Sequence, residues 1–229
     1  MNDTNDRFGY DSLAYFGRVN ASISHELKNV MAIISETAGL LSDLSDMAIA
    51  GTPIAPDMLK DCTGSIVEEI QRGFSVIRQM NRFSHSIDKP VESVSLLEVL
   101  DLAINLSEYL SFAGKTDVRS ADGLTPMVVT CPFVLQALVY QVLVYTFKNT
   151  GAGAEISISI NSMGDDEGWK LIFSGFSVSG FKMFPDALIK AMAASIGVTI
   201  NCDSTADWLE LMVPSSIETG TMLDVQAPV

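Results

Sequence analysis

One histidine lies on a predicted helix, beside polar side chains that could assist its chemistry. His25 precedes Glu26, and Asn29 follows one helical turn later. Each residue of an α-helix turns by about 100°, so His25 is expected to point away from the apolar residues Ile23 and Leu27. An exposed imidazole beside a carboxylate and an amide can act as a nucleophile or a proton carrier near neutral pH. The alternative interpretation is a surface histidine on a charged helix face.

Residues that commonly bind metals or form disulfides are few and scattered. The only other histidine is His85, and the three cysteines, Cys62, Cys131 and Cys202, show no paired spacing. A zinc site or a disulfide framework would need such spacing. The sequence therefore predicts no metal site and reduced thiols.

Two long helices are predicted to position His25. Residues 11–50 contain no proline, and apolar residues three and four positions apart form a seam in which Asn20 and Thr37 are polar members. A turn follows at Gly51, and a second helix is predicted over residues 57–86. The apolar seam residues are Phe16, Ile23, Leu27, Val30, Ile34, Leu41 and Leu44 in the first helix, and Leu59, Ile66, Ile70, Phe74, Ile77 and Phe83 in the second.

These two helices are predicted to form an antiparallel hairpin, because only a short turn joins them. One hairpin cannot surround its own apolar seam. The sequence therefore predicts a homodimer whose two hairpins form a four-helix bundle.

From about residue 91 the pattern changes to a mixture of helices and strands. The strictly alternating residues 155–160 and the apolar residues 170–173 are predicted to form a β-hairpin. The predicted fold class is α+β, with helices on one face of a mixed sheet. We expect helices over 96–111, 132–147 and 185–196, and further strands over 127–130, 198–202 and 208–213. The expected domains are the hairpin at 1–90, an α/β sandwich at 91–220 and a tail at 221–229.

The charge and hydropathy of the chain exclude several classes of partner. The 229 residues include 28 acidic and 14 basic side chains, a net charge of −14. This balance argues against binding nucleic acid or an anionic membrane surface. The polar residues 1–10 do not resemble a secretory signal, and the longest apolar-rich stretch, 133–147, is too short to span a bilayer. We expect a cytoplasmic protein.

The residues around His25 resemble the H box of bacterial sensor histidine kinases. The sequence from Ser24 to Asn29 reads SHELKN, which is that family's pattern. The resemblance implies that His25 is phosphorylated, that Glu26 helps to accept its proton, and that Asn29 takes part in dephosphorylating a response regulator. Val30 departs from the pattern, because proline is usual there.

The second half of the chain resembles the ATP-binding domain of the same family without its ATP motifs. The two asparagines of the family's N box fall on Gln141 and Tyr145, and a tyrosine lacks the carbonyl oxygen that coordinates magnesium. Ser174 stands where an aspartate binds adenine, and residues 186–192 lack the glycines of the second glycine box. The domain is also acidic and has no glycine-rich loop to hold phosphates. The resemblance implies a degenerate kinase-type sandwich that does not bind ATP.

The predicted function is histidine phosphotransfer in a two-component phosphorelay, as in bacterial dimeric histidine phosphotransferases. His25 would accept a phosphoryl group from a receiver-domain aspartate of a response regulator and donate it to another. Glu26 would hold the imidazole or take its proton, and Lys28 would steady the phosphate charge. The chain would need no cofactor, with Mg²⁺ bound only by the partner receiver. The alternatives are a response-regulator phosphatase, in which Asn29 positions water, and a non-catalytic pseudokinase scaffold. An active ATP-dependent kinase has the least support.

Overall fold

The structure is a computed structural model that describes residues 2–108, 114–120, 125–150, 153, 155–164, 167–177, 184–203, 205 and 207–217, with side chains from Leu13 onward. The expected tail at 221–229 lies outside the described residues. The chain divides into two compact units. One unit comprises Arg18–Arg82, and the other comprises Met1–Gly17 together with Phe83–Val229.

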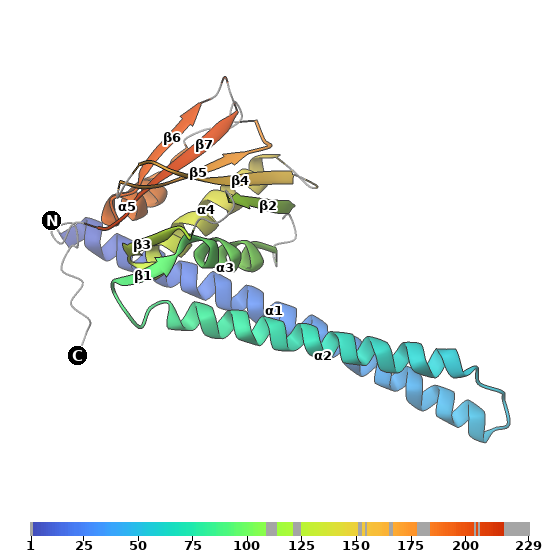
Figure 1. Ribbon diagram of the computed structural model, residues 1–229. Coiled ribbons are helices and arrows are strands. Elements are labelled where there is room, and N and C mark those ends of the chain that lie inside the picture. The colour runs from blue at the N-terminus through green and yellow to red at the C-terminus, as the bar shows by residue number, and fades with distance from the viewer. Residues whose placement is uncertain are drawn as a thin grey trace. The chain divides into compact units, whose positions relative to one another are not determined.

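The unit Arg18–Arg82, which we call the hairpin unit, contains most of α1 (Asn2–Ile49) and most of α2 (Pro56–His85), and these helices run antiparallel (Figure 1). α1 is followed by Gly51, whose φ of 89° is a left-handed conformation that glycine adopts without a steric penalty. In this turn the Thr52 backbone nitrogen donates a hydrogen bond to the Met47 carbonyl oxygen over 3.0 Å. Proline at the first position of α2 suits a helix start, because the missing N–H has no partner within the helix.

The predicted seam of α1 is the side of that helix that the chain covers. Ile23, Val30 and Leu44 are buried, with at most 4% of their surface exposed. The polar members Asn20 and Thr37 are half-buried on the same side. The spacing of three and four residues therefore identified the covered face of α1 correctly.

The predicted apolar side of α2 is covered only in part within the single chain. Of its six members only Ile66 and Phe83 are covered, whereas Leu59, Ile70, Phe74 and Ile77 are 40%, 40%, 53% and 41% exposed. The buried side of α2 instead carries Cys62, Gly73 and Val76. The difference arises because α2 has two apolar faces.

A glycine lies on the covered face of α2, at a point of close approach to α1. A Cβ atom added at Gly73 would lie 3.3 Å from Cγ1 of Val30.

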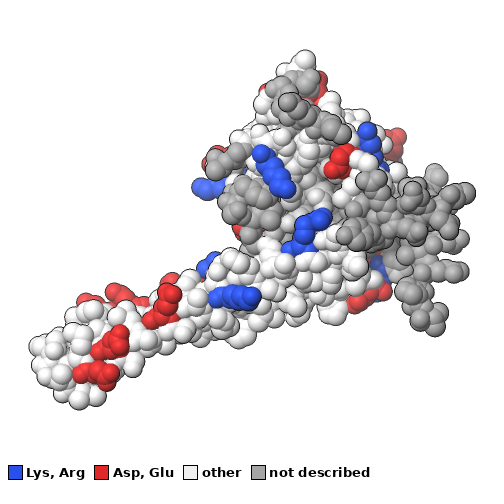
Figure 2. All heavy atoms as spheres, turned by 180° about the vertical axis from the view of Figure 1, so that it is seen from behind, with Lys and Arg blue, Asp and Glu red and all other residues white. Residues whose placement is uncertain are grey.

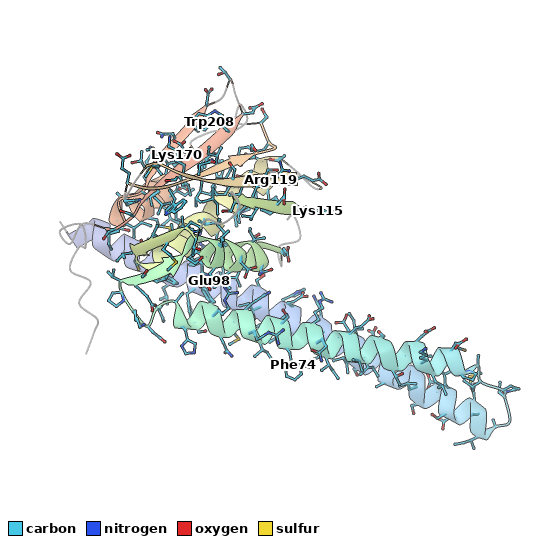
Figure 3. All side chains as sticks on the ribbon, viewed as in Figure 1. Phe74, Glu98, Lys115, Arg119, Lys170 and Trp208 are labelled. Atoms are coloured by element: carbon cyan, nitrogen blue, oxygen red, sulfur yellow. The ribbon has the colours of Figure 1, made fainter. Side chains whose placement is uncertain are left out.

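The other apolar face of α2 comprises Leu59, Val67, Ile70, Phe74 and Ile77 and is exposed in the single chain. We call these five residues the outer stripe of α2. Figure 3 shows Phe74 projecting from α2 into the solvent.

The second unit contains a five-stranded mixed sheet. Its strand order is β2-β4-β5-β7-β6, with β2 and β4 parallel and the other neighbours antiparallel. β1 and β3 form a separate antiparallel pair. The elements are β1 (Glu92–Ser95), α3 (Leu96–Glu108), β2 (Lys115–Ser120), β3 (Met127–Thr130), α4 (Pro132–Thr150), β4 (Glu155–Ser162), β5 (Gly168–Ser174), α5 (Ala187–Ser195), β6 (Thr199–Asp203) and β7 (Trp208–Pro214).

Helices cover one face of this sheet, as Figure 1 shows for α3, α4 and α5. On β4 the covered side carries Ile156, Ile158 and Ile160, all at most 1% exposed, while Ser157 and Ser159 lie on the other side. The alternation of apolar and polar residues thus matches the period of the strand. The predicted α+β class is confirmed, as is the predicted order of a long helical hairpin followed by a sheet unit.

An aromatic cluster lies within the second unit, to which the first residues of α1 and the last residues of α2 belong. The Tyr15 ring centroid lies 5.7 Å from that of Phe83, 5.6 Å from that of Phe133 and 5.2 Å from that of Tyr140. Tyr15 and Phe83 are completely buried. Contacts of this kind between aromatic rings stabilise a core beyond the area that they bury.

Candidate functional site

The predicted site residues lie on neighbouring turns of α1 within the hairpin unit. His25, Lys28 and Asn29 are exposed, so the imidazole faces solvent as the helical spacing predicted. The Glu26 side chain is 12% exposed, since it turns toward α2. The site is therefore a surface site on a regular helix.

Asn29 brings three of the four predicted residues together. Its amide nitrogen Nδ2 lies 3.3 Å from Nδ1 of His25 and 3.4 Å from Oε2 of Glu26. The spacings of four and three residues place these side chains on one face of the helix. Lys28 lies on the same turn and has no ion pair among the described residues.

The structure adds Arg72 of α2, which the sequence analysis did not identify. Its Nη2 donates a hydrogen bond to Oε1 of Glu26, 46 residues away in sequence. Its Nη1 lies 3.3 Å from Oε2 of Glu69, one turn earlier on α2. Finding Arg72 from the sequence would require the register between α1 and α2, because its local neighbours contain no sign of this contact.

The Arg72 guanidinium is held at the site by the negative charges of Glu26 and Glu69. Partial burial lowers its pKa, but the charges and hydrogen bonds of Glu26 and Glu69 outweigh that effect, and the pKa is raised above its ordinary value. Arg72 therefore carries a positive charge at any pH at which the protein is folded. Glu26 faces this fixed positive charge on one side and the Asn29 amide on the other.

Acidic and basic side chains separate along the hairpin. Red acidic groups gather at the turn end in Figure 2, and blue basic groups lie farther from that end. Near the turn the exposed acids are Asp43, Asp46, Asp57 and Asp61, whereas Lys28, Arg72 and Arg78 are exposed in the part that carries His25. The part that carries His25 also contains Glu26, Glu68 and Glu69, so acidic and basic side chains are mixed there.

In the sheet unit, two of the residues compared above with ATP motifs, Tyr145 and Asp186, make contacts within the protein. Tyr145 of α4 packs against Phe184 with ring centroids 4.8 Å apart, and burial with the nearby Asp186 charge raises the pKa of its hydroxyl. Asp186 caps α5 by accepting a hydrogen bond from the Ile189 nitrogen over 2.8 Å. Ser174 is the last residue of β5.

Two further features bear on cofactors and membranes. The described part of the chain contains no group of three or more His, Cys, Asp or Glu side chains that could hold a metal ion. None of the helices that the structure describes is both long enough and apolar enough to cross a bilayer.

No protein-family model matches the sequence, and no curated protein is similar to it in sequence. Solved structures that resemble the chain include the histidine kinase AdeS of Acinetobacter baumannii, with 12% identity over 83% of this chain and 98% of that chain and a TM-score of 0.44. The ATP-binding domain of PrrB from Mycobacterium tuberculosis is 20% identical over 56% of this chain and 98% of that chain, with a TM-score of 0.42. A bacterial phosphotransferase is 13% identical over 87% of this chain and 95% of that chain, with a TM-score of 0.49.

Proposed function

We propose that this protein transfers phosphoryl groups between receiver domains of response regulators through His25. The observation that carries the proposal is the exposed imidazole of His25 on a regular helix, hydrogen-bonded to Asn29, which also contacts Glu26. The SHELKN sequence around it resembles the phosphoacceptor segment of histidine kinases. An exposed imidazole held in a fixed position can meet the acidic site of another protein without moving the helix.

The transfer exchanges one phosphoryl bond for another. A lone pair of the imidazole attacks phosphorus of an aspartyl phosphate, the bond from phosphorus to the carboxylate oxygen breaks, and the carboxylate leaves with the electron pair. Donation to a second receiver is the reverse reaction. In the proposal Glu26 holds the ring through the Asn29 amide, the ring proton leaves to solvent, and Lys28 steadies the phosphate charge.

This reaction takes place without ATP in the proposal, because the donor receiver supplies the phosphoryl group and binds the Mg²⁺. The contact between Tyr145 and Phe184 supports that part of the proposal. Tyr145 stands where the resemblance places a magnesium-binding asparagine, and its phenol packs on an aromatic ring.

The partners in the proposal are receiver domains and a second copy of this chain. Receiver domains carry an acidic phosphorylation site, which suits the basic residues in the part of the hairpin near His25. The outer stripe of α2 supports a homodimer, because five exposed apolar side chains on one helix face are costly to leave in water.

The direct test is to incubate the protein with a panel of receiver domains carrying labelled aspartyl phosphate. We expect label on the protein that is stable to alkali and labile to acid, as a phosphoramidate bond is. His25→Ala should abolish the labelling, and His85→Ala should leave it unchanged, since these are the only two histidines. Label on the protein after His25→Ala would contradict the proposal.

The same experiment separates the alternative functions. The contact of Asn29 with His25 favours a phosphatase as the second candidate, because the amide could orient a water molecule at this position. A phosphatase would remove the label from the receiver without any labelled histidine. A scaffold would bind the receiver and leave its label in place.

A further inference from the structure

A chain of hydrogen bonds crosses the hairpin unit and ends on His25. It runs from Arg72 of α2 to Glu26, from Glu26 to the Asn29 amide, and from that amide to the His25 ring. Three of its four residues, His25, Glu26 and Asn29, were expected to take part in phosphoryl transfer or dephosphorylation. Their contacts with one another define a further property of the site, namely which nitrogen of His25 carries the proton.

The orientation of the Asn29 amide follows from its contact with Glu26. The amide nitrogen lies 3.4 Å from Oε2 of Glu26, and an ionised carboxylate oxygen only accepts hydrogen bonds. The opposite orientation would turn the Asn29 oxygen toward a second oxygen and lose a hydrogen bond. Glu26 therefore fixes the amide with its NH₂ group toward both neighbours.

This orientation selects one tautomer of the histidine. The same amide nitrogen lies 3.3 Å from Nδ1 of His25, and an amide NH₂ can only donate. Nδ1 must then hold a lone pair. Since a neutral imidazole carries one ring proton, that proton is on Nε2.

Arg72 fixes the other end of the chain. Its guanidinium holds Oε1 of Glu26 and is itself supported by Glu69. Without this ion pair, Glu26 could turn toward solvent, and the Asn29 amide would lose the contact that decides its orientation. Arg72 acts on His25 only through Glu26 and Asn29, so it is a positioning residue.

We propose that Arg72 acts through Glu26 and Asn29 as a tautomer latch, which holds the His25 proton on Nε2 until the network opens. This inference rests on the proposed phosphotransfer function. Nδ1 is covered by the Asn29 amide, which leaves Nε2 for the phosphoryl donor. In the latched state Nε2 has no lone pair to attack with.

Transfer to Nε2 then requires the ring proton to be on Nδ1 instead of Nε2. The Nε2 proton leaves to solvent, Nδ1 takes up one proton, and the Asn29 NH₂ group moves away from Nδ1. The Nε2 lone pair then forms the bond to phosphorus, and the donor's leaving group departs with the electrons of its own bond to phosphorus. Arg72 slows this sequence because it stabilises the latched arrangement.

The first measurement is nitrogen NMR of the full chain labelled in its histidine rings, on the alkaline side of neutrality where imidazoles are neutral. In the native protein Nδ1 of His25 should show the shift of an unprotonated nitrogen and Nε2 that of a protonated one. His85 is an internal reference of the opposite kind, because its Nδ1 lies 2.7 Å from the Asp88 carboxylate and must donate to it.

Substitutions of the residues in this hydrogen-bond network should move the His25 signals in stated directions. Asn29→Asp introduces an acceptor beside Nδ1 and should reverse the tautomer. Arg72→Gln should raise the share of the Nδ1-protonated form roughly fivefold, the effect of one hydrogen bond of ordinary net strength. Arg72→Lys should preserve the native signals, as should the matched control Arg78→Gln, since Arg78 has no ion pair among the described residues.

The second measurement is the rate of His25 phosphorylation by phosphoramidate, a small donor that needs no docking surface. Its phosphorus–nitrogen bond breaks, ammonia leaves, and phosphorus bonds to the ring nitrogen. We expect Arg72→Gln to react roughly fivefold faster than the native protein. Arg72→Lys and Arg78→Gln should react at the native rate. Unchanged His85 signals in each variant show that the local structure at the end of α2 is retained.

The outcomes separate this inference from the proposed function. A protonated Nδ1 in native His25, or signals unmoved by Arg72→Gln, would overturn the latch whatever the protein does with receivers. Shifted signals with an unchanged phosphoramidate rate would overturn its effect on transfer. If the signals and rates behave as expected but no receiver labels His25, the latch stands and the phosphorelay function is wrong.

Discussion

Arg72 of α2 donates a hydrogen bond to the carboxylate of Glu26, the residue that follows His25 in α1. A residue adjacent to the proposed nucleophile is thus held by the opposite helix of the hairpin. The arrangement makes the chemistry of His25 depend on the register between the two helices and not on the SHELKN segment alone. The following expectations test the site, the assembly and the sheet unit separately.

Replacing His25 with alanine should remove phosphoryl acceptance and leave the fold intact. The side chain is exposed and alanine is a better helix former, so the free energy of unfolding should change by no more than about 0.5 kcal/mol. Chemical denaturation and labelling by phosphorylated receivers measure the two effects on one preparation. An unfolded variant would show instead that the histidine is structural.

Asn29→Ala should retain phosphoryl acceptance and weaken any dephosphorylation of a receiver. Alanine removes the amide that lies beside the ring but leaves the imidazole and Glu26 in place. Time courses of label on the receiver and on His25 distinguish the two activities. Loss of acceptance in this variant would assign Asn29 to the transfer step itself.

Phe74→Glu should shift the protein from dimer to monomer. Phe74 is 53% exposed in the single chain and belongs to the outer stripe of α2, so a buried carboxylate would replace apolar contact in the dimer. Sedimentation at micromolar concentrations measures the change. Gln71→Glu is the matched control, since this exposed residue of α2 lies outside the stripe. A native protein that sediments as a stable monomer would contradict the expectation.

ATP with magnesium should produce no heat of binding in a calorimetric titration at micromolar protein. By the resemblance, Tyr145 stands where a magnesium-binding asparagine is expected and packs instead on Phe184, and Ser174 stands where an ionised aspartate is expected to bind adenine, so the stronger, charged acceptor is missing. A micromolar affinity would support an active kinase.

Cys131 should react with an alkylating reagent only at higher pH than an ordinary cysteine. Burial raises the pKa of the Cys131 thiol, and the hydrogen bonds from the backbone at Val134 and Phe133 lower it by less. The thiolate, which is the reactive form, therefore forms above the usual range. Peptide mass spectrometry across a pH series should show the exposed Cys202 labelled first. Faster labelling of Cys131 at neutral pH would contradict this environment.

Local spacing predicted the elements whose burial is decided by their own sequence. The alternation at Ile156 and Ile158 identified β4, and the seam through Val30 identified the covered face of α1. β2 was missed because Val118 is its only large apolar residue, and its pairing is with β4, which lies far along the chain. A strand whose stability comes from a distant partner leaves little local pattern.

The site was predicted to the same extent and for the same reason. His25, Glu26 and Asn29 share one helix face, which the spacing of three and four residues establishes. Arg72 belongs to another helix, and its contact depends on a register that no local pattern contains. On α2 the residues Ile70 and Val76 lie on two apolar faces, and spacing alone does not say which of the two α1 covers.

Gly73 of α2 lies close to the site residues on both helices. It stands next to Arg72, and Val30, which its missing Cβ would approach to 3.3 Å, stands next to Asn29. A methyl group at this position would require Val30 to give by a few tenths of an ångström, at the level where the ion pair closes, and Val30→Ala would make room for it. Proton placement on His25 could then be adjusted by two apolar positions that never touch the ring.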